Sequence, residues 1–160
     1  MNSIQKNKFS NERSFSQINV IKNKDKIHIL AKCLEEKKDF VFETVFSSEE
    51  KLDFLRKAHE IGFFIRFFYV CTSNPMINVS RITKRYLEGG HEVPISKIIS
   101  RYYKSYINAT KAINFVDRAY IYDNSVEDQL PQLLFRMTEG KVFKQYTDNI
   151  PELAQPLMNK

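Results

Sequence analysis

Hydrophobic residues follow two patterns along the chain, and each pattern predicts a different kind of element. Between residues 26 and 37 they recur at helical spacing (Ile27, Leu30, Ala31 and Leu34), which predicts an amphipathic helix. Residues 40–46 and 63–70 are short, nearly continuous runs of aromatic and β-branched side chains, typical of strands covered on both faces in a parallel sheet. Glu43 interrupts the first run. Because a buried carboxylate is costly without a partner, we expect Glu43 to face a partner or a cleft.

Local signals predict where the next helices begin and end. Ser47 and Glu50 have the spacing of a capping box, so a helix is expected from Ser47 as N-cap to just before Gly62. A second helix should have Pro75 in its first turn and should end at the double glycine at 89–90.

The rest of the chain combines one long helix with further strands. The long helix is expected from about residue 95 to 115, with a buried stripe of Ile95, Ile98, Ile99, Tyr102, Tyr106, Ile107 and Ile113. Residues 118–122 form a third strand candidate, and a β-hairpin is expected around Glu139-Gly140. A short helix near residues 151–158 follows.

The order of these elements predicts the fold class. Strands alternate with helices through residues 26–122, which favours βαβ units and an α/β sheet. Because open α/β sheets bind ligands beyond the carboxyl ends of their strands, residues 43–48, 71–74 and 123–125 should line one rim. Residues 1–25 are expected to be a polar basic tail with a short strand at 18–21, and residues 26–160 the folded domain.

Charge narrows the classes of partner. The 160 residues carry a formal charge of +6, and the excess lies in two blocks, residues 1–32 and 81–118, each with net +5. The first block favours a solvated tail over a nucleic-acid arm, so nucleic acid is an unlikely partner.

No apolar run approaches the length of a membrane span. Cys33 and Cys71 lack metal-site spacing, and we expect reduced, buried thiols in a cytoplasmic protein.

The bases of the second block fall at helical spacings. Arg81 and Arg85 are four residues apart on one helix, while Lys97, Arg101 and Lys104 repeat at intervals of four and three on the next. Two basic faces joined by a double glycine can close on a polyanion, since arginine binds phosphate oxygens through two parallel hydrogen bonds. A solvated basic helical hairpin is an equally good interpretation of this pattern taken alone.

Four stretches resemble a known family. They are FVFETVFSS, FFIRFFYV, SNPMINVSRITKRYLEGGHEVPISKIISRYYKS and YIYDNS. Together they resemble the zeta-toxin-like P-loop kinases, and more closely the bacterial branch described as predicted ATPases. The long pattern R-x-x-x-R-x-x-x-G-G-H-x-V-P-x-x-K-I-x-x-R-Y fits from Arg81 to Tyr102. The resemblance covers roughly residues 27–150 and implies an α/β ATP-binding fold with a helical lid.

The resemblance assigns roles to several residues. It implies that five basic residues bind phosphate: Arg81, Arg85, His91, Lys97 and Arg101. Arg85 and Arg101 match the groups that would grip the transferring phosphate, and so are the expected catalytic residues. Glu43 and Thr44 match the E-T pair beside the acceptor substrate. Asp123 and Asn124 match the residues near the nucleotide base.

The family also implies cofactors and a substrate class. It uses ATP with Mg²⁺, and it includes kinases that phosphorylate UDP-activated amino sugars, so the acceptor would be a small or sugar-nucleotide hydroxyl. However, the four glycines of this sequence, at 62, 89, 90 and 140, form no G-x-x-x-x-G-K-[ST] loop. The residues that would hold the β- and γ-phosphates and Mg²⁺ are therefore missing, and no metal ligands are assigned.

This departure sets the expectations for activity and partners. We expect a sheet that is incomplete and N-terminally truncated relative to the family, and no kinase activity from this chain alone. The alternative is a non-catalytic nucleotide- or partner-binding module. Because residues 40–46 and 63–70 would leave apolar strand edges unpaired, a complementary N-terminal fragment, an antitoxin, a second copy or the tail at 18–21 is the expected partner.

Overall fold

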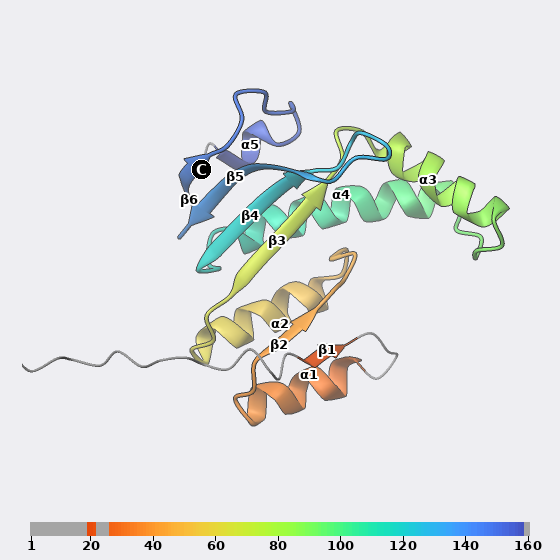
Figure 1. Ribbon diagram of the computed structural model, residues 1–160. Helices are drawn as coiled ribbons and strands as arrows, with labels where there is room; N and C mark the ends of the chain where they lie inside the picture. Colours follow the sequence, from red (N-terminus) through yellow and green to blue (C-terminus); the bar gives the residue numbers. More distant parts are fainter. Residues whose placement is uncertain (1–18, 22–25, 159–160) are drawn as a thin grey trace, which may run out of the picture. The chain divides into compact units, whose positions relative to one another are not determined.

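The computed structural model describes residues 19–21 and 26–158, and the chain divides into two compact units (Figure 1). The first unit is Met1–Thr44 and the second is Val45–Lys160. Both units combine helices with strands, so the predicted α/β class is confirmed.

The first unit contains two short parallel strands and one helix. They are β1 (Asn19–Ile21), α1 (Lys26–Glu35) and β2 (Phe40–Phe42). The predicted helix and the short strand near residues 18–21 are confirmed, and β1 pairs with β2. The strand predicted over residues 40–46 was too long, because β2 ends at Phe42. Phe46 has a φ of 58°, and this left-handed conformation is incompatible with a continuing strand.

The second unit is built on a four-stranded sheet of order β3-β4-β5-β6. Its strands are β3 (Arg66–Cys71), β4 (Arg118–Asp123), β5 (Gln132–Thr138) and β6 (Lys141–Gln145). The first two run parallel, whereas β4, β5 and β6 are antiparallel neighbours. The predicted hairpin is confirmed at Glu139-Gly140, where φ is 50° and 74°, as a two-residue turn with both residues at positive φ requires.

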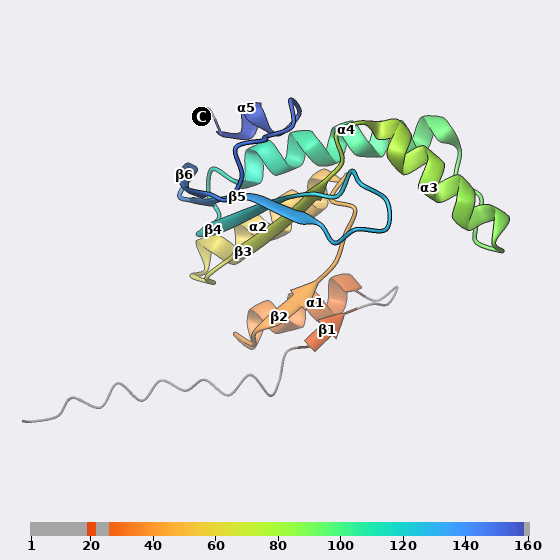
Figure 2. The same cartoon turned by 45° about the horizontal axis from the view of Figure 1, so that its top comes forward.

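The helices of the second unit are α2 (Glu49–Glu60), α3 (Pro75–Leu87), α4 (Ile95–Ala112) and α5 (Gln155–Met158). Figure 2 shows α3 and α4 following one another along the upper side of the unit, and each packs against a neighbour: α3 on α4, and α4 on α2. Together with strands β3 to β5, these helices bury the apolar core: Leu52, Leu55, Ile98, Ile113, Ile121, Leu134, Phe135 and Met137.

Two details of the helix predictions were wrong. The N-cap of α2 is Ser48, not Ser47, and its side chain makes no capping hydrogen bond. The start shifts because Phe46 turns the chain in the left-handed region just before it. Glu49 and Glu50 lie in the first turn, where their negative charges favour the helix N-terminus without a capping box.

The buried face of α4 is also rotated from the predicted stripe. Ile95 and Ile107 are exposed, while Asn108, Ala109 and Ala112 are buried. Small side chains let α4 lie close to its neighbours, so its buried side combines Ile98 with two alanines and one amide and leaves out several of the large apolar residues.

Candidate functional site

The loops that follow β3 and β4 are joined by hydrogen bonds. Asn124 N–H donates to the carbonyl of Cys71 at 2.8 Å, and Ser73 N–H donates to Ser125 Oγ at 2.8 Å. Because the two strands are parallel, their carboxyl ends meet at one edge of the sheet. The predicted meeting of residues 71–74 with 123–125 is therefore confirmed.

Asp123 organises its own loop. Its Oδ1 accepts hydrogen bonds from Ser125 N–H, at 3.0 Å, and from the Ser125 hydroxyl. The carboxylate thus supports the turn that presents Asn124. The predicted contact of Asp123 and Asn124 with a nucleotide base stays a prediction.

Arg81 fastens helix α3 to this loop. Its guanidinium donates to the carbonyls of Asn124, at 2.8 Å, and Val126, at 3.2 Å. One helical turn further on, Lys84 forms an ion pair with Glu127 at 3.1 Å. Part of the hydrogen-bonding capacity of Arg81 is therefore used to position the loop. The other predicted phosphate-binding residues make no such hydrogen bond within the described residues.

Thr72 links the same edge to α4. Tyr102 donates its hydroxyl proton to the carbonyl of Thr72 at 2.6 Å, while Asn78 Nδ2 donates to Thr72 Oγ1 at 3.1 Å. Burial raises the pKa of Tyr102 to about 12, so the phenol remains a protonated donor at neutral pH. Burial, reinforced by Asp123, also raises the pKa of Cys71 to about 12, which keeps it an unreactive thiol.

The end of α3 is shaped by its two glycines. Gly89 has a φ of 97° and donates to the carbonyl of Tyr86 at 3.0 Å, while Gly90 donates to the carbonyl of Arg85 at 2.9 Å. This pair of bonds is the Schellman motif of a helix C-terminus. A Cβ at Gly90 would lie 2.7 Å from the carbonyl oxygen of Arg85, so only glycine fits there without displacement.

Four of the predicted phosphate-binding residues lie on the segments before and after this turn: Arg85, His91, Lys97 and Arg101. All four are exposed. Within the part of the chain that the structure describes, their side chains make no ion pair or hydrogen bond. Arg85 lies in the last turn of α3, and Lys97 and Arg101 lie on successive turns of α4. We call these four residues the basic lid.

Glu43 and Thr44 lie at the end of the first unit, directly after β2. Both are exposed. The basic lid belongs to the second unit, so the predicted meeting of the acceptor-binding residues with the phosphate-binding residues stays a prediction.

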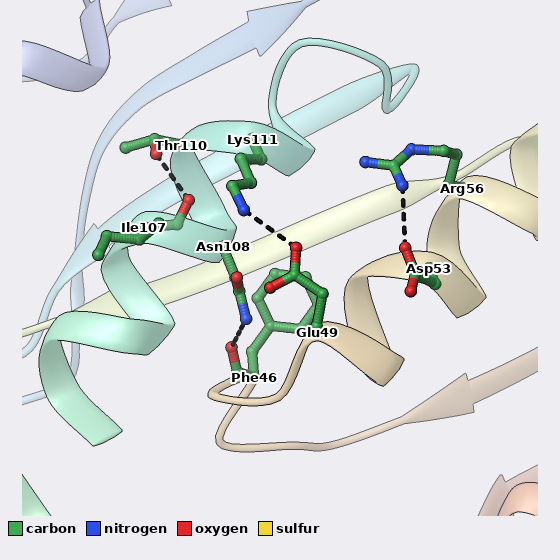
Figure 3. A network of polar contacts seen from close by, with 8 residues as sticks. All are labelled: Phe46, Glu49, Asp53, Arg56, Ile107, Asn108, Thr110 and Lys111. Carbon is green, nitrogen blue, oxygen red and sulfur yellow. Dashed lines mark hydrogen bonds and ion pairs between the residues drawn. The ribbon is translucent and has the colours of Figure 1, made fainter. Parts of the chain in front are cut away.

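Sequence reasoning missed one buried polar contact (Figure 3). Asn108 Nδ2 donates to the carbonyl of Phe46 at 3.0 Å, and Lys111, on the next turn of α4, forms an ion pair with Glu49 at 3.0 Å. These contacts attach the start of α2 to α4. The only signal in the sequence was an amide within a helical stretch, which does not reveal its partner 62 residues away.

Candidate metal ligands do not cluster in the described ranges. No group of three or more His, Cys, Asp or Glu side chains among residues 19–21 and 26–158 is placed to hold a metal ion. In the same ranges, no helix is both long enough and apolar enough to cross a membrane.

Comparison with known families agrees with the resemblance seen in the sequence. A family model described as Zeta toxin matches residues 10–130, a segment that contains the basic lid, Glu43, Thr44, Asp123 and Asn124. The chain belongs to the zeta toxin family. No curated protein and no solved structure matches it. Membership in this family indicates a kinase-like P-loop fold.

Proposed function

We propose that this zeta toxin family chain binds the phosphate groups of a nucleotide or sugar nucleotide through its basic lid. The supporting observation is that Arg85, His91, Lys97 and Arg101 are exposed and make no ion pair or hydrogen bond within the described residues. Cations that are not neutralised by the protein are available to a ligand with several negative charges.

The chemistry of these side chains suits phosphate oxygens. Arg85 and Arg101 can each donate two parallel hydrogen bonds to one phosphate group, and Lys97 adds a compact charge one turn before Arg101. The Schellman turn at Gly89 and Gly90 sets the direction of the chain between the two helices. The described residues thus fit the phosphates of ATP, with no cluster of ligands for Mg²⁺.

The remaining predicted residues complete the proposal. Glu43 and Thr44 would bind the acceptor hydroxyl, a small molecule or a sugar nucleotide. Asp123 and Asn124, on the loop anchored by Arg81, would lie beside the nucleotide base. In a kinase, Arg85 and Arg101 would stabilise the negative charge of the transferring phosphoryl group, which is the main contribution that a protein makes to this reaction.

Catalysis by these 160 residues alone should be undetectable. They contain no G-x-x-x-x-G-K-[ST] loop, and the loss of a single electrostatic stabiliser typically slows a reaction about 10²- to 10³-fold. We expect radiolabelled ATP to show no turnover above background with UDP-N-acetylglucosamine as acceptor. Turnover that disappears in Arg85→Ala would instead establish an active kinase. If no turnover is detected, the second candidate is favoured, a nucleotide- or partner-binding module without catalysis.

Calorimetric titration tests the binding itself. ATP and UDP-N-acetylglucosamine should each bind the wild-type chain, and the double substitution Arg85→Ala, Arg101→Ala should weaken binding at least about tenfold, because two charge-assisted contacts are lost.

A matched control is Lys57→Ala, which removes an exposed cation from α2 and should leave both affinities unchanged. If neither ligand binds the wild-type chain, or if the double variant binds as well as the wild type, the basic lid is a solvated helical surface and the proposal is wrong.

A further inference from the structure

One face of the four-stranded sheet carries exposed rings and cations. Its opposite face holds the buried residues of alternate strand positions, such as Tyr69, Ile121, Phe135 and Met137. On the first face, Phe64, Phe68 and Val70 are 57%, 57% and 50% exposed. We call this first face the open face. It is a feature of the second unit, separate from the basic lid.

Strand register arranges the open face in two rows that run across the strands. In the first row Arg66 is paired with Arg118, Arg118 with Thr138, and Thr138 with Lys141. In the second row Phe68 is paired with Tyr120, Tyr120 with Arg136, and Arg136 with Lys144. Because neighbouring strands are about 4.8 Å apart, the first row brings three cations and one threonine close together, and the second places two aromatic rings beside two cations.

The cations of these rows are not neutralised. Arg66 and Arg118 lie directly opposite one another, as do Arg136 and Lys144, and like charges in such positions destabilise a sheet. Neither row contains an acidic residue, and none of the five cations forms an ion pair within the described residues. Their repulsion would be relieved by an anionic ligand that spans several strands.

Aromatic rings hold these cations in place. The guanidiniums of Arg66 and Arg118 lie 5.5 and 5.3 Å from the centre of the Phe64 ring. Arg136 lies 4.2 Å from the centre of the Phe143 ring, and its buried Nε has no hydrogen-bond partner. These three guanidiniums are therefore oriented on the sheet rather than extended into solvent.

Two stacked aromatic rings lie beside these cations on the open face. Phe68 and Tyr120 are stacked with their centres 4.8 Å apart and their planes 9° from parallel. Among the described residues β3 is an edge strand of its sheet, so Phe68 ends this stack at the side of the sheet, where a further planar group can extend it. Bases of a single-stranded nucleic acid stack on aromatic side chains in this way, and its phosphates bind nearby cations.

We propose that the open face binds single-stranded nucleic acid, with the strand crossing the sheet, a base stacked on Phe68 and phosphates at the row of Arg66, Arg118 and Lys141. A second copy of the chain would bring these same uncompensated cations against one another. An acidic amphipathic helix fits less well, because the exposed apolar residues Phe68, Val70 and Phe143 are interspersed with Tyr120 and cations and form no continuous apolar stripe. RNA and DNA share the required chemistry.

Fluorescence anisotropy of the full chain with labelled 12-mers tests this proposal. The probes are oligouridylate, oligothymidylate and an abasic deoxyribose-phosphate 12-mer of the same charge. We expect a base-bearing 12-mer to bind about tenfold tighter than the abasic one. Its affinity should fall with salt with a logarithmic slope of about −2, as three phosphate contacts require. The ratio between the uridylate and thymidylate affinities identifies RNA or DNA as the preferred source.

Variants separate stacking from charge. Phe68→Ala should lower the affinity for the base-bearing 12-mer to that of the abasic one, whereas Leu130→Ala, which removes a 93% exposed apolar side chain from a loop, should not. The charge reversal Arg66→Glu, Arg118→Glu should reduce all binding more than tenfold, and Lys57→Glu on α2 should not. Lys141→Glu, Lys144→Glu provides a second reversal if the first variant does not fold.

Three results would overturn the proposal. The first is no binding at about 100 µM protein, since even non-specific complexes form in that range. The second is equal affinity for the abasic and base-bearing probes. The third is displacement of the 12-mer by poly-L-glutamate with no effect of Phe68→Ala, which would assign the face to an acidic protein partner.

Discussion

Replacing Asn108 with Asp should lower the free energy of unfolding at pH 7 by about 3 kcal/mol or more. Asn108 is only 4% exposed, and its amide donates to the carbonyl of Phe46 at 3.0 Å. A carboxylate has nearly the same shape but cannot donate a hydrogen bond. It would place a buried negative charge against a carbonyl oxygen, so the attachment of the α2 start to α4 would be lost (Figure 3).

The loss should depend on pH in a defined direction. Burial raises the pKa of the new carboxyl in the folded chain above its value in the unfolded chain, which is about 3.9. Below that value both states are protonated, and the carboxyl proton can be donated to the Phe46 carbonyl. As the pH rises above it, only the unfolded state ionises, so the stability of the variant falls until the folded pKa is reached.

Urea denaturation of Asn108→Asp and wild type at pH 4 and pH 7 measures this difference. Asn108→Ala is the control, because it removes the same hydrogen bond without a titrating group, and its loss should be the same at both pH values. An Asn108→Asp variant that is as stable as wild type at pH 7 would show that the carboxylate reaches water, and that Asn108 does not hold α2 and α4 together.

Elements defined by short-range signals were predicted well. Asn74 and Pro75 begin α3 as expected, with Asn74 accepting a hydrogen bond from Met76 N–H at 2.8 Å. Gly89 ends the same helix, and Glu139 and Gly140 form the hairpin turn. In each case the backbone conformation is fixed by the residues themselves, through a proline ring, a side-chain cap or a glycine at positive φ.

Features that depend on tertiary packing were not predictable in the same way. The capping box at Ser47 has the correct residues, yet the left-handed Phe46 moves the start of α2 by one position. The apolar stripe of α4 was drawn through Ile95 and Ile107, although close packing buries Asn108 and the alanines beside it instead. A hydrophobic pattern indicates which residues are able to be buried, while the neighbouring elements decide which of them are.

In the candidate site, too, local rules predicted some contacts, while contacts that depend on tertiary packing were not predictable. The meeting of the loops after β3 and β4 follows from the rule for parallel strands, and the structure confirms it. The binding of Arg81 to the carbonyls of Asn124 and Val126 does not follow, because an arginine four residues before Arg85 looks equivalent to it in sequence. The rows across the sheet are likewise invisible in the sequence, since they depend on the register of four strands.

Replacing Gly90 with Ala should lower the stability of the second unit by about 2 kcal/mol and weaken ATP binding. The added Cβ would lie 2.7 Å from the carbonyl oxygen of Arg85 and 3.2 Å from its Cγ. A backbone oxygen cannot move away without breaking the Gly90-to-Arg85 hydrogen bond, so the last turn of α3 must shift. That shift displaces Arg85, a member of the basic lid.

Substitutions at two other glycines show how much of the expected loss comes from backbone strain and how much from the displacement of Arg85. Gly89 and Gly62 have φ values of 97° and 90°, and a Cβ at either one would meet no atom within 4 Å. Gly89→Ala and Gly62→Ala should therefore cost about 1 kcal/mol each from left-handed strain. Gly62 ends α2 with the same type of hydrogen bonds, far along the chain from the basic lid, so Gly62→Ala should leave ATP affinity unchanged.

Thermal denaturation and ATP titration of the three variants measure the loss of stability and the loss of affinity. If Gly90→Ala loses no more stability than Gly62→Ala and keeps full affinity, the end of α3 does not set the position of Arg85.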